Sequence, residues 1–250
     1  MNFQLRKHYI LTTLEQQRSL TVAAVAAHLG TTPITVRRDL AELESQGLLV
    51  RTHGGAVLPS VARHPVAFAR KAAVNLPQKT YICQLAARQV AEGDTIFMDC
   101  GSTTFPLCAL VRHLRIRVIT NSLPVLFELV GSAAQVVVAG GEVDAGRQAV
   151  HGALAAEHLR RYTFDKAFLG ADGLSLSRGL SANGEPEASI SQAVLAGARR
   201  AFLLCDSSKL EQDKYLQFAP LSAIHTLITD AQADPAVLAR YEEAGLRVLR

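Results

Sequence analysis

Apolar positions near the N-terminus recur with the period of an α-helix. Over TVAAVAAHL, residues 21–29, they fall at spacings of 0, 3, 4 and 7, at Val22, Val25, Ala26 and Leu29. Such spacing places one apolar stripe on a helix, and Thr21 stands where a residue caps the first turn. Gly30 follows directly, and glycine commonly ends a helix. The pattern predicts a short amphipathic helix that stops in a tight turn.

A second helix is predicted directly after that turn, in TTPITVRRDLAEL at residues 31–43. Thr32 can cap it, and Pro33 can occupy the first helical position, where its missing N–H costs nothing. The core stripe is Val36, Leu40 and Leu43, which leaves the outer face and flanks to Ile34, Thr35, Arg37 and Arg38. Two helices joined by a short turn, with arginines on the second, are typical of the DNA-binding helix-turn-helix motif.

The arginine pair has two interpretations. Charged residues on a helix surface often do no more than solvate it, whereas arginine in a DNA groove bonds guanine bidentately or clamps a phosphate. Ile34 favours the second interpretation, because an exposed isoleucine at a helix start has little to pack against but can meet a thymine methyl.

LLVRTHGGAVL at residues 48–58 places two short β-prone runs around a Gly-Gly turn. This pattern predicts a hairpin, or wing, whose basic tip could touch the DNA backbone or minor groove. The DNA-binding residues expected from the second helix and the wing are Thr32, Ile34, Thr35, Arg37, Arg38, Arg51 and His53.

The remaining chain reads as a connector followed by an α/β domain. Residues 59–78 contain three prolines and show no sustained period, and we expect a helix near residue 79. Beyond it, short apolar runs alternate with helical patterns, which predicts a largely parallel sheet. The expected strands are TIFMD (95–99), VITN (118–121), QVVVAG (135–140), DKAFLGA (165–171), AFLLCD (201–206) and TLITD (226–230).

Polar residues gather where these strands are expected to end, the edge at which open α/β sheets bind ligands. The loop at 99–104, DCGSTT, is expected to lead into a helix whose first N–H groups, with its hydroxyls, would hold an anion. Each such loop alone is also ordinary turn composition. Five of them in one sheet favour a polar pocket for a phosphorylated polyol.

Charge divides unevenly along the chain. Residues 1–70 hold eight Lys and Arg against four Asp and Glu, so the net +4 of the chain lies there and residues 71–250 balance. That asymmetry suits a small polyanion-binding module joined to a neutral domain. The apolar runs are too short for a membrane span, and the first twenty residues lack a signal peptide's apolar block. We therefore expect a cytoplasmic protein.

The cysteines give no sign of a metal or dithiol site. Cys83, Cys100, Cys108 and Cys205 show no C-x-x-C spacing. Buried free thiols are the preferred interpretation, with a redox role for Cys100 or Cys205 as the weaker alternative. We predict no metal and no cofactor.

The stretch LG-TT-PITVRRDL-AELESQGLLVRTHGGAVL closely resembles the N-terminal domain of the DeoR family of bacterial transcriptional regulators. Further along, D-x-G-x-T, the T-N-S turn, G-G, F-D-x-A-F-L-G-A-D-G and D-x-S-K resemble that family's effector domain. The resemblance implies a winged helix-turn-helix domain at 1–58 and an α/β effector-sensing and oligomerisation domain at 79–250, similar in fold to ribose 5-phosphate isomerase. The effector-binding residues expected from the loops and the resemblance together are Asp99, Gly101, Ser102, Thr103, Thr104, Asn121, Ser122, Gly140, Gly141, Asp172, Glu187 and Lys209.

These features favour a repressor of carbohydrate-metabolism genes that binds double-stranded operator DNA as a dimer or tetramer and leaves it when a phosphorylated sugar binds. The alternative is a sugar phosphate isomerase with an appended DNA-binding module, which would need a base to move a proton between carbons. Asp172, Glu187 and Lys209 are candidates for that role. A third, weaker alternative is an architectural DNA-binding protein without an effector. Because a sensor needs only to bind its ligand, and the winged module gives that binding a consequence, we expect no enzyme activity.

Overall fold

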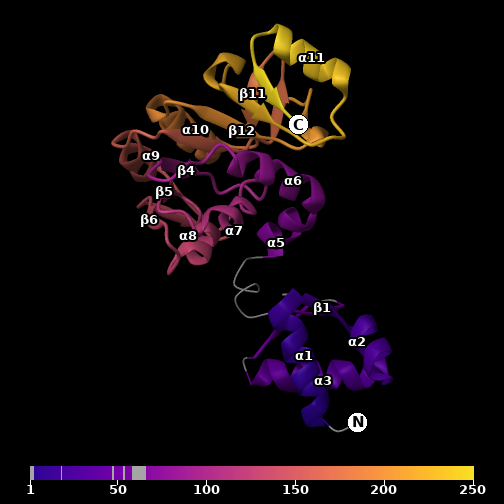
Figure 1. Cartoon of the computed structure of the whole chain (residues 1–250). Helices are drawn as coiled ribbons and strands as arrows, with labels where there is room; N and C mark the ends of the chain where they lie inside the picture. The colour runs from indigo at the N-terminus through magenta and orange to yellow at the C-terminus, as the bar shows by residue number, and fades with distance from the viewer. Residues whose placement is uncertain (1–2, 18, 47, 53, 58–65) are drawn as a thin grey trace. The chain divides into compact units, whose positions relative to one another are not determined.

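The chain forms two compact units, Met1–Val66 and Ala67–Arg250. The computed structural model describes residues 3–17, 19–46, 48–52, 54–57 and 66–250 (Figure 1). In the stretch expected as a connector, residues 59–65 lie outside the described residues. Its later part contains helix α5 (Val66–Ala73) and the first residues of α6 (Leu76–Ala87).

The first unit is a winged helix-turn-helix domain. It contains α1 (Phe3–Gln17), α2 (Val22–Leu29) and α3 (Pro33–Ser45), with strands β1 (Ser19–Thr21), β2 (Val50–Thr52) and β3 (Gly55–Val57). The expected wing is the antiparallel β2–β3 hairpin, and β1 adds a third strand on the other side of β3. The two helices and the wing predicted from the sequence are therefore confirmed.

Local side-chain chemistry sets the ends of the two central helices. The Thr21 hydroxyl accepts a hydrogen bond from Ala24 N–H at 3.2 Å, and the Thr32 hydroxyl accepts one from Thr35 N–H at 3.3 Å. Gly30 ends α2 in the left-handed conformation, with φ of 57°, which costs glycine little. The expected core residues Val22, Val25, Ala26, Val36, Leu40 and Leu43 are buried.

A seven-stranded sheet forms the centre of the second unit. Its order is β15-β14-β12-β9-β4-β5-β6, and every neighbouring pair is parallel. The strands are β4 (Thr95–Met98), β5 (Arg117–Thr120), β6 (Gln135–Val138), β9 (Lys166–Leu169), β12 (Ala201–Leu204), β14 (Thr226–Ile228) and β15 (Arg247–Leu249). The parallel α/β sheet is confirmed. β15 was not predicted, because the three residues RVL are too few to show a period.

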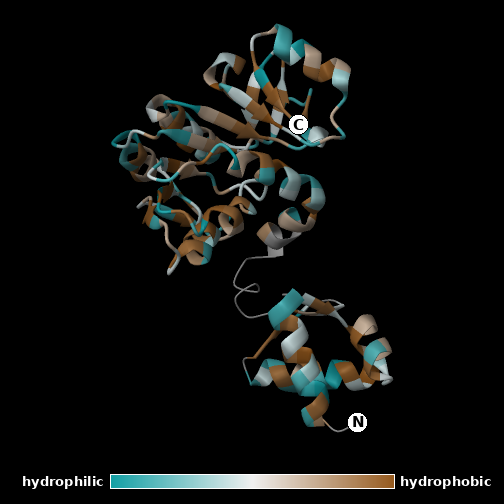
Figure 2. Ribbon diagram, viewed as in Figure 1, coloured by the Kyte–Doolittle hydropathy of each residue, from teal (hydrophilic) through white to brown (hydrophobic). Residues whose placement is uncertain are grey.

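Helices cover both faces of this sheet. Ile96 and Met98 of β4 pack with α6, α7 (Leu107–Val111) and α8 (Leu123–Leu129), whereas Phe97 packs with α9 (Ala153–Arg160) and α10 (Glu185–Gly197). Successive strand residues point to opposite faces, so a strand buried on both faces reads as the continuous apolar run TIFM. The strands are accordingly rich in hydrophobic residues in Figure 2.

A small antiparallel sheet, a hairpin and two short 3-10 helices complete the second unit. The strands β10 (Gly173–Ser175), β11 (Gly179–Ala182) and β13 (Leu216–Ala219) form an antiparallel sheet that shares a core with α11 (Pro235–Glu243). A hairpin joins β7 (Glu142–Asp144) to β8 (Ala149–His151). Short 3-10 helices lie at Ser207–Lys209 and Leu221–Ala223. No helix in the described part of the chain is both long and apolar enough to span a bilayer.

Candidate functional site

A cavity of about 510 Å³ lies where β4, β9 and β12 end, and this volume is in the range of small-molecule sites. The loops after these strands supply residues 99–103, 170–172, 206, 208 and 209 of its wall. The α5–α6 corner, the β7–β8 hairpin and the start of α10 supply other parts. The polar wall residues are Lys71, Asn75, Lys79, Asp99, Ser102, Thr103, Asp144, Arg147, Asp172, Glu187, Ser191, Asp206, Ser208 and Lys209.

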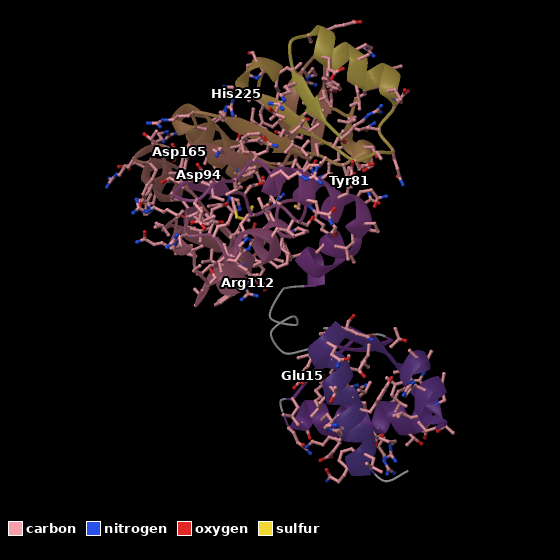
Figure 3. The ribbon with its side chains drawn as sticks, viewed as in Figure 1. Glu15, Tyr81, Asp94, Arg112, Asp165 and His225 are labelled. Carbon is pink, nitrogen blue, oxygen red and sulfur yellow. The ribbon has the colours of Figure 1, made fainter. Side chains whose placement is uncertain are left out.

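Seven of the twelve expected effector-binding residues line this cavity: Asp99, Gly101, Ser102, Thr103, Asp172, Glu187 and Lys209. They come from three strand ends and one helix start, so the fold brings together residues far apart in sequence. The acidic side chains Asp94 and Asp165, labelled in Figure 3, belong to the opposite edge of the sheet, before β4 and β9. There Lys166 and Arg199 pair with them.

The other five expected residues lie outside the cavity wall and have structural contacts. The Thr104 hydroxyl bonds to the Asp99 and Gly101 carbonyl oxygens at 2.8 and 2.7 Å. Asn121 donates to the Val150 carbonyl, and Ser122 caps α8. The Gly140 N–H donates to His158 Nδ1 at 3.2 Å, and a Cβ on Gly141 would lie 2.6 Å from the His151 carbonyl oxygen.

The turn after β4 differs from the expected helix start. Helix α7 begins at Leu107, and residues 102–106 form turns. Pro106 explains the delay, because proline disfavours the helical conformation of the residue before it. Within the described residues, the backbone N–H groups of Gly101, Ser102 and Thr103 have no hydrogen-bond partner in the protein. The turn can therefore still present donors to an anion, but without the dipole of a helix that begins there.

Lys79 is one of the polar wall residues that sequence reasoning missed; the others are Lys71, Asn75, Asp144, Arg147, Ser191, Asp206 and Ser208. It is 4% exposed, and its ammonium donates to the Ser102 hydroxyl at 3.0 Å and to the Lys71 carbonyl oxygen. No carboxylate among the described residues pairs with it. Burial, and then the Lys209 ammonium, lower the pKa of Lys79, while Asp206 acts in the opposite direction. A signal existed in the sequence: Lys79 falls on the apolar stripe of Ile82, Cys83 and Ala86.

The loop after β12 positions the second lysine. Lys209 donates to the Ala171 carbonyl oxygen at 3.1 Å and lies 3.9 Å from the Asp206 carboxylate. Asp206 is buried and accepts hydrogen bonds from Ser208 N–H and from the Asn75 side chain at 3.2 Å. Lys209, Lys71 and Lys79 therefore concentrate positive charge in the part of the cavity wall near the loop after β12.

Three carboxylates of the cavity wall already have hydrogen-bond or ion-pair partners. Burial raises the pKa of Asp99, which accepts the Gly170 N–H at 3.1 Å. Asp172 accepts the Asn183 N–H at 3.0 Å, and Glu187 forms an ion pair with Arg147 of the β7–β8 hairpin. Carboxylates fixed in this way can accept hydrogen bonds from sugar hydroxyls.

The four cysteines are free thiols, as preferred from the sequence. Cys83, Cys108 and Cys205 are buried, and burial raises the pKa of Cys83 and of Cys205 to about 12. Cys100 is half-buried in the cavity wall, and burial raises its pKa as well. A raised pKa disfavours the reactive thiolate.

The outer face of α3 carries the candidate DNA contacts. Ile34 is 76% exposed, and Thr32, Arg37 and Arg38 are also exposed, while Thr35 is half-buried. No described carboxylate pairs with Arg37 or Arg38. Arg51 of the wing lies 3.8 Å from Glu44, and His53 lies outside the described residues.

A buried ion pair holds this helix against α1. Arg6 and Asp39 form two hydrogen bonds, with Nη2 to Oδ1 at 2.9 Å and Nε to Oδ2 at 2.5 Å. A bidentate pair fixes orientation as well as distance. It therefore helps to set how α3 presents its arginines.

Comparison with known families matches both units. Residues 6–61 match the DeoR-like helix-turn-helix domain, and residues 74–231 match the DeoR C terminal sensor domain. The HTH-type transcriptional regulator GlpR of Haloferax volcanii is 34% identical over 246 residues, 98% of this chain and 96% of that protein. The lactose phosphotransferase system repressor of Streptococcus mutans is 32% identical over 95% of this chain and 97% of its own length.

Two further similarities extend this comparison. The glycerol-3-phosphate regulon repressor of Escherichia coli is 29% identical over 93% of both chains. Among solved structures, ribose 5-phosphate isomerase A of Methanocaldococcus jannaschii aligns with 54% of this chain and 55% of its own, at 22% identity and a TM-score of 0.41.

Proposed function

Because this chain belongs to the DeoR family of transcriptional regulators, we propose that it represses genes of carbohydrate metabolism and leaves its operator when a phosphorylated sugar binds. It is a DNA-binding transcriptional regulator. Relatives are named as repressors of lactose and glycerol-3-phosphate systems.

Operator binding is assigned to α3 and the wing. Arg37 and Arg38 are exposed without an acidic partner among the described residues, so they are free to bond base edges or phosphates. Ile34 offers an apolar contact for a thymine methyl, and Thr32 and Thr35 supply hydroxyls. Arg51 and His53 of the wing are proposed to contact the DNA backbone. The nearby carboxylate of Glu44 weakens the attraction of Arg51 to a DNA phosphate.

Effector binding is assigned to the cavity, and one observation carries this assignment. Lys79 is a buried ammonium bonded to Ser102, beside three N–H groups, and among the described residues neither this ammonium has a carboxylate partner nor these N–H groups an acceptor. A buried charge normally requires a counterion, and phosphate matches such donors. Asp99, Asp172 and Lys209 supply further polar groups for the sugar.

A release assay tests the proposal. DNA that carries the operator would be selected from random duplexes and bound to the full-length protein, and phosphorylated sugars would be added singly. The proposal expects at least one sugar phosphate to release the DNA. Thr103→Ala and Lys209→Ala proteins should bind this DNA normally but need more effector, and an unchanged response in both would show that the site is elsewhere.

The protein is further proposed to act in the cytoplasm, as a homo-oligomer. One recognition helix reads few base pairs, and regulators commonly pair two half-sites. Light scattering on the free protein and on its DNA complex tests this, and a monomer in both states would contradict it.

The isomerase alternative is tested separately. Its candidate groups Asp172, Glu187 and Lys209 each have a protein partner, which favours binding over proton transfer. Incubation with pentose and hexose phosphates, followed by product analysis, would detect isomerisation.

A further inference from the structure

The cavity wall has opposite charge at its two ends. At the end beside α5, α6 and the loop after β12, Lys71, Lys79 and Lys209 lie near Asp206, with the further wall carboxylate Asp172 on the loop after β9. We call this the lysine end. At the end beside the β7–β8 hairpin, Asp99, Asp144 and Glu187 face a single cation, Arg147. We call this the hairpin end.

Sheet order separates the two ends. Lys209 follows β12, whereas the hairpin is fixed to the end of β5 through hydrogen bonds from Val150 N–H to Asn121 O (2.7 Å) and from Leu123 N–H to Gln148 O (2.9 Å). β12 and β5 are three positions apart in the sheet, with β9 and β4 between them. At about 4.8 Å per strand this is roughly 14 Å. A ligand that reaches both ends must lie across the strand ends.

The hairpin end also holds polar atoms without partners. In the wall itself, Glu187 Oε2 is buried and accepts no hydrogen bond from the described residues, and outside the wall Asn121 Oδ1 and the ring nitrogens of His151 are likewise buried and unpaired there. His151 is 5% exposed and Asn121 is fully buried. Such unmet groups are uncommon and costly. Of these, Glu187 Oε2 belongs to the cavity wall, so it can accept a hydrogen bond from a neutral group of a ligand or from water.

We propose that the cavity binds a sugar or polyol monophosphate lengthwise, with the phosphate at the lysine end and uncharged hydroxyls at the hairpin end, and that the hairpin end rejects a second anionic group. This inference rests on the proposed function. The carboxylates at the hairpin end can accept hydrogen bonds from hydroxyls, whereas a second phosphate or a carboxylate would meet three like charges. Arg147 pairs with Glu187 and offsets one of these charges, so three carboxylates and one guanidinium leave the hairpin end with a net charge of −2.

Calorimetry with matched ligands on the full-length protein tests whether the cavity prefers ligands with a single anionic group. Sorbitol 6-phosphate and 6-phosphogluconate differ in one terminal group, a hydroxymethyl or a carboxylate. Fructose 6-phosphate and fructose 1,6-bisphosphate differ in a second phosphate, and inorganic phosphate fills the lysine end alone. In at least one pair the monophosphate should bind about tenfold or more tightly than its doubly anionic counterpart and than inorganic phosphate.

A Glu187 variant tests whether this carboxylate causes the preference for a single anionic group. Glu187→Gln removes one carboxylate and frees Arg147, so the preference for the monophosphate should fall by about tenfold or more, while inorganic phosphate binds as before. The matched control is Glu157→Gln, which breaks an exposed pair with Arg161 (3.0 Å) on α9, away from the cavity. A melting curve confirms that each variant is folded.

The outcomes separate this inference from the proposed function. Equal or tighter binding of the doubly anionic ligands, or an unchanged preference in Glu187→Gln, overturns the inference. If a bisphosphate or a phosphorylated sugar acid releases operator DNA while the monophosphates do not, the inference fails and the proposed function stands. If no phosphorylated compound alters DNA binding, the proposed function fails.

Discussion

Replacing Lys79 by methionine tests the anion site most directly. Methionine keeps an unbranched, apolar stem of four heavy atoms but lacks the terminal ammonium. Two of the three ammonium donors already bond to Ser102 and Lys71, which leaves one for a bound phosphate. The substitution therefore removes one charge-assisted hydrogen bond to the ligand.

The magnitude follows from that one bond. A hydrogen bond to a charged group contributes about 1.5–3 kcal/mol, so the dissociation constant should rise by roughly 12-fold to 160-fold. At a ligand concentration 100 times the original dissociation constant, the unmodified protein gains about 2.7 kcal/mol of stability. The variant should gain only about 0.3–1.3 kcal/mol. For a unit of this size the melting temperature should rise by roughly 5–11 °C in the unmodified protein and roughly 1–5 °C in the variant.

Thermal unfolding with and without sugar phosphate measures this difference. Lys214→Met is the control, because it removes an ammonium outside the cavity wall and should keep the full ligand-induced shift. The Lys79 variant should also still bind operator DNA, since the change lies in the second unit. A full ligand-induced shift in the Lys79→Met protein would refute the assignment of its ammonium to the anion.

Three more predictions concern the DNA-binding unit and pH. Replacing Arg37 and Arg38 together by alanine should weaken the salt dependence of binding to a nonspecific duplex. The slope of log affinity against log salt concentration should fall by about 0.9 for each DNA phosphate that the variant no longer neutralises. Fluorescence anisotropy across a KCl series measures this slope, and an unchanged slope together with an unchanged operator affinity would contradict the prediction. Thr32→Ala should cost about 0.5–2 kcal/mol because it removes the 3.3 Å hydrogen bond that caps α3, and a denaturant titration that finds Thr32→Ser equally destabilised would contradict the capping role. Burial lowers the pKa of His151 below 6.5, so the folded state binds this proton less tightly than the unfolded chain. Stability should fall as the pH drops from 6.5 through the folded pKa, and His151→Gln should reduce that loss in melting curves.

Local pattern was enough for much of the fold. Thr21, Gly30 and Thr32 act within one helical turn, so their roles as helix ends could be predicted from neighbouring residues alone. The apolar runs that form β4, β9 and β12 were equally visible, because strands buried on both faces are apolar throughout. By contrast, β15 is a three-residue strand that gains its place from pairing with β14, which no local pattern encodes.

Site membership depended on the order of strands. The sequence indicated polar loops at strand ends, but it did not determine which loops would share a cavity. Thr104 and Asn121 are of the same residue types as Thr103 and Asn75 in the cavity wall, yet their side chains bond to nearby carbonyl groups instead. Sequence reasoning chose them because a turn residue and a ligand-binding residue are chemically alike.

The sequence by itself determined the two-domain plan, the helix α3 with its exposed arginines and the polar edge of the sheet, because each depends on residues within a few positions of one another. Tertiary structure alone decided that Lys79 and Arg147 belong to the site. Asn75 bonds to Asp206 across 131 positions of sequence, and this contact exists because parallel strands bring distant loops to one edge of the sheet. The charge of each end of the cavity is a sum over such distant residues, and it becomes defined only when the sheet has assembled.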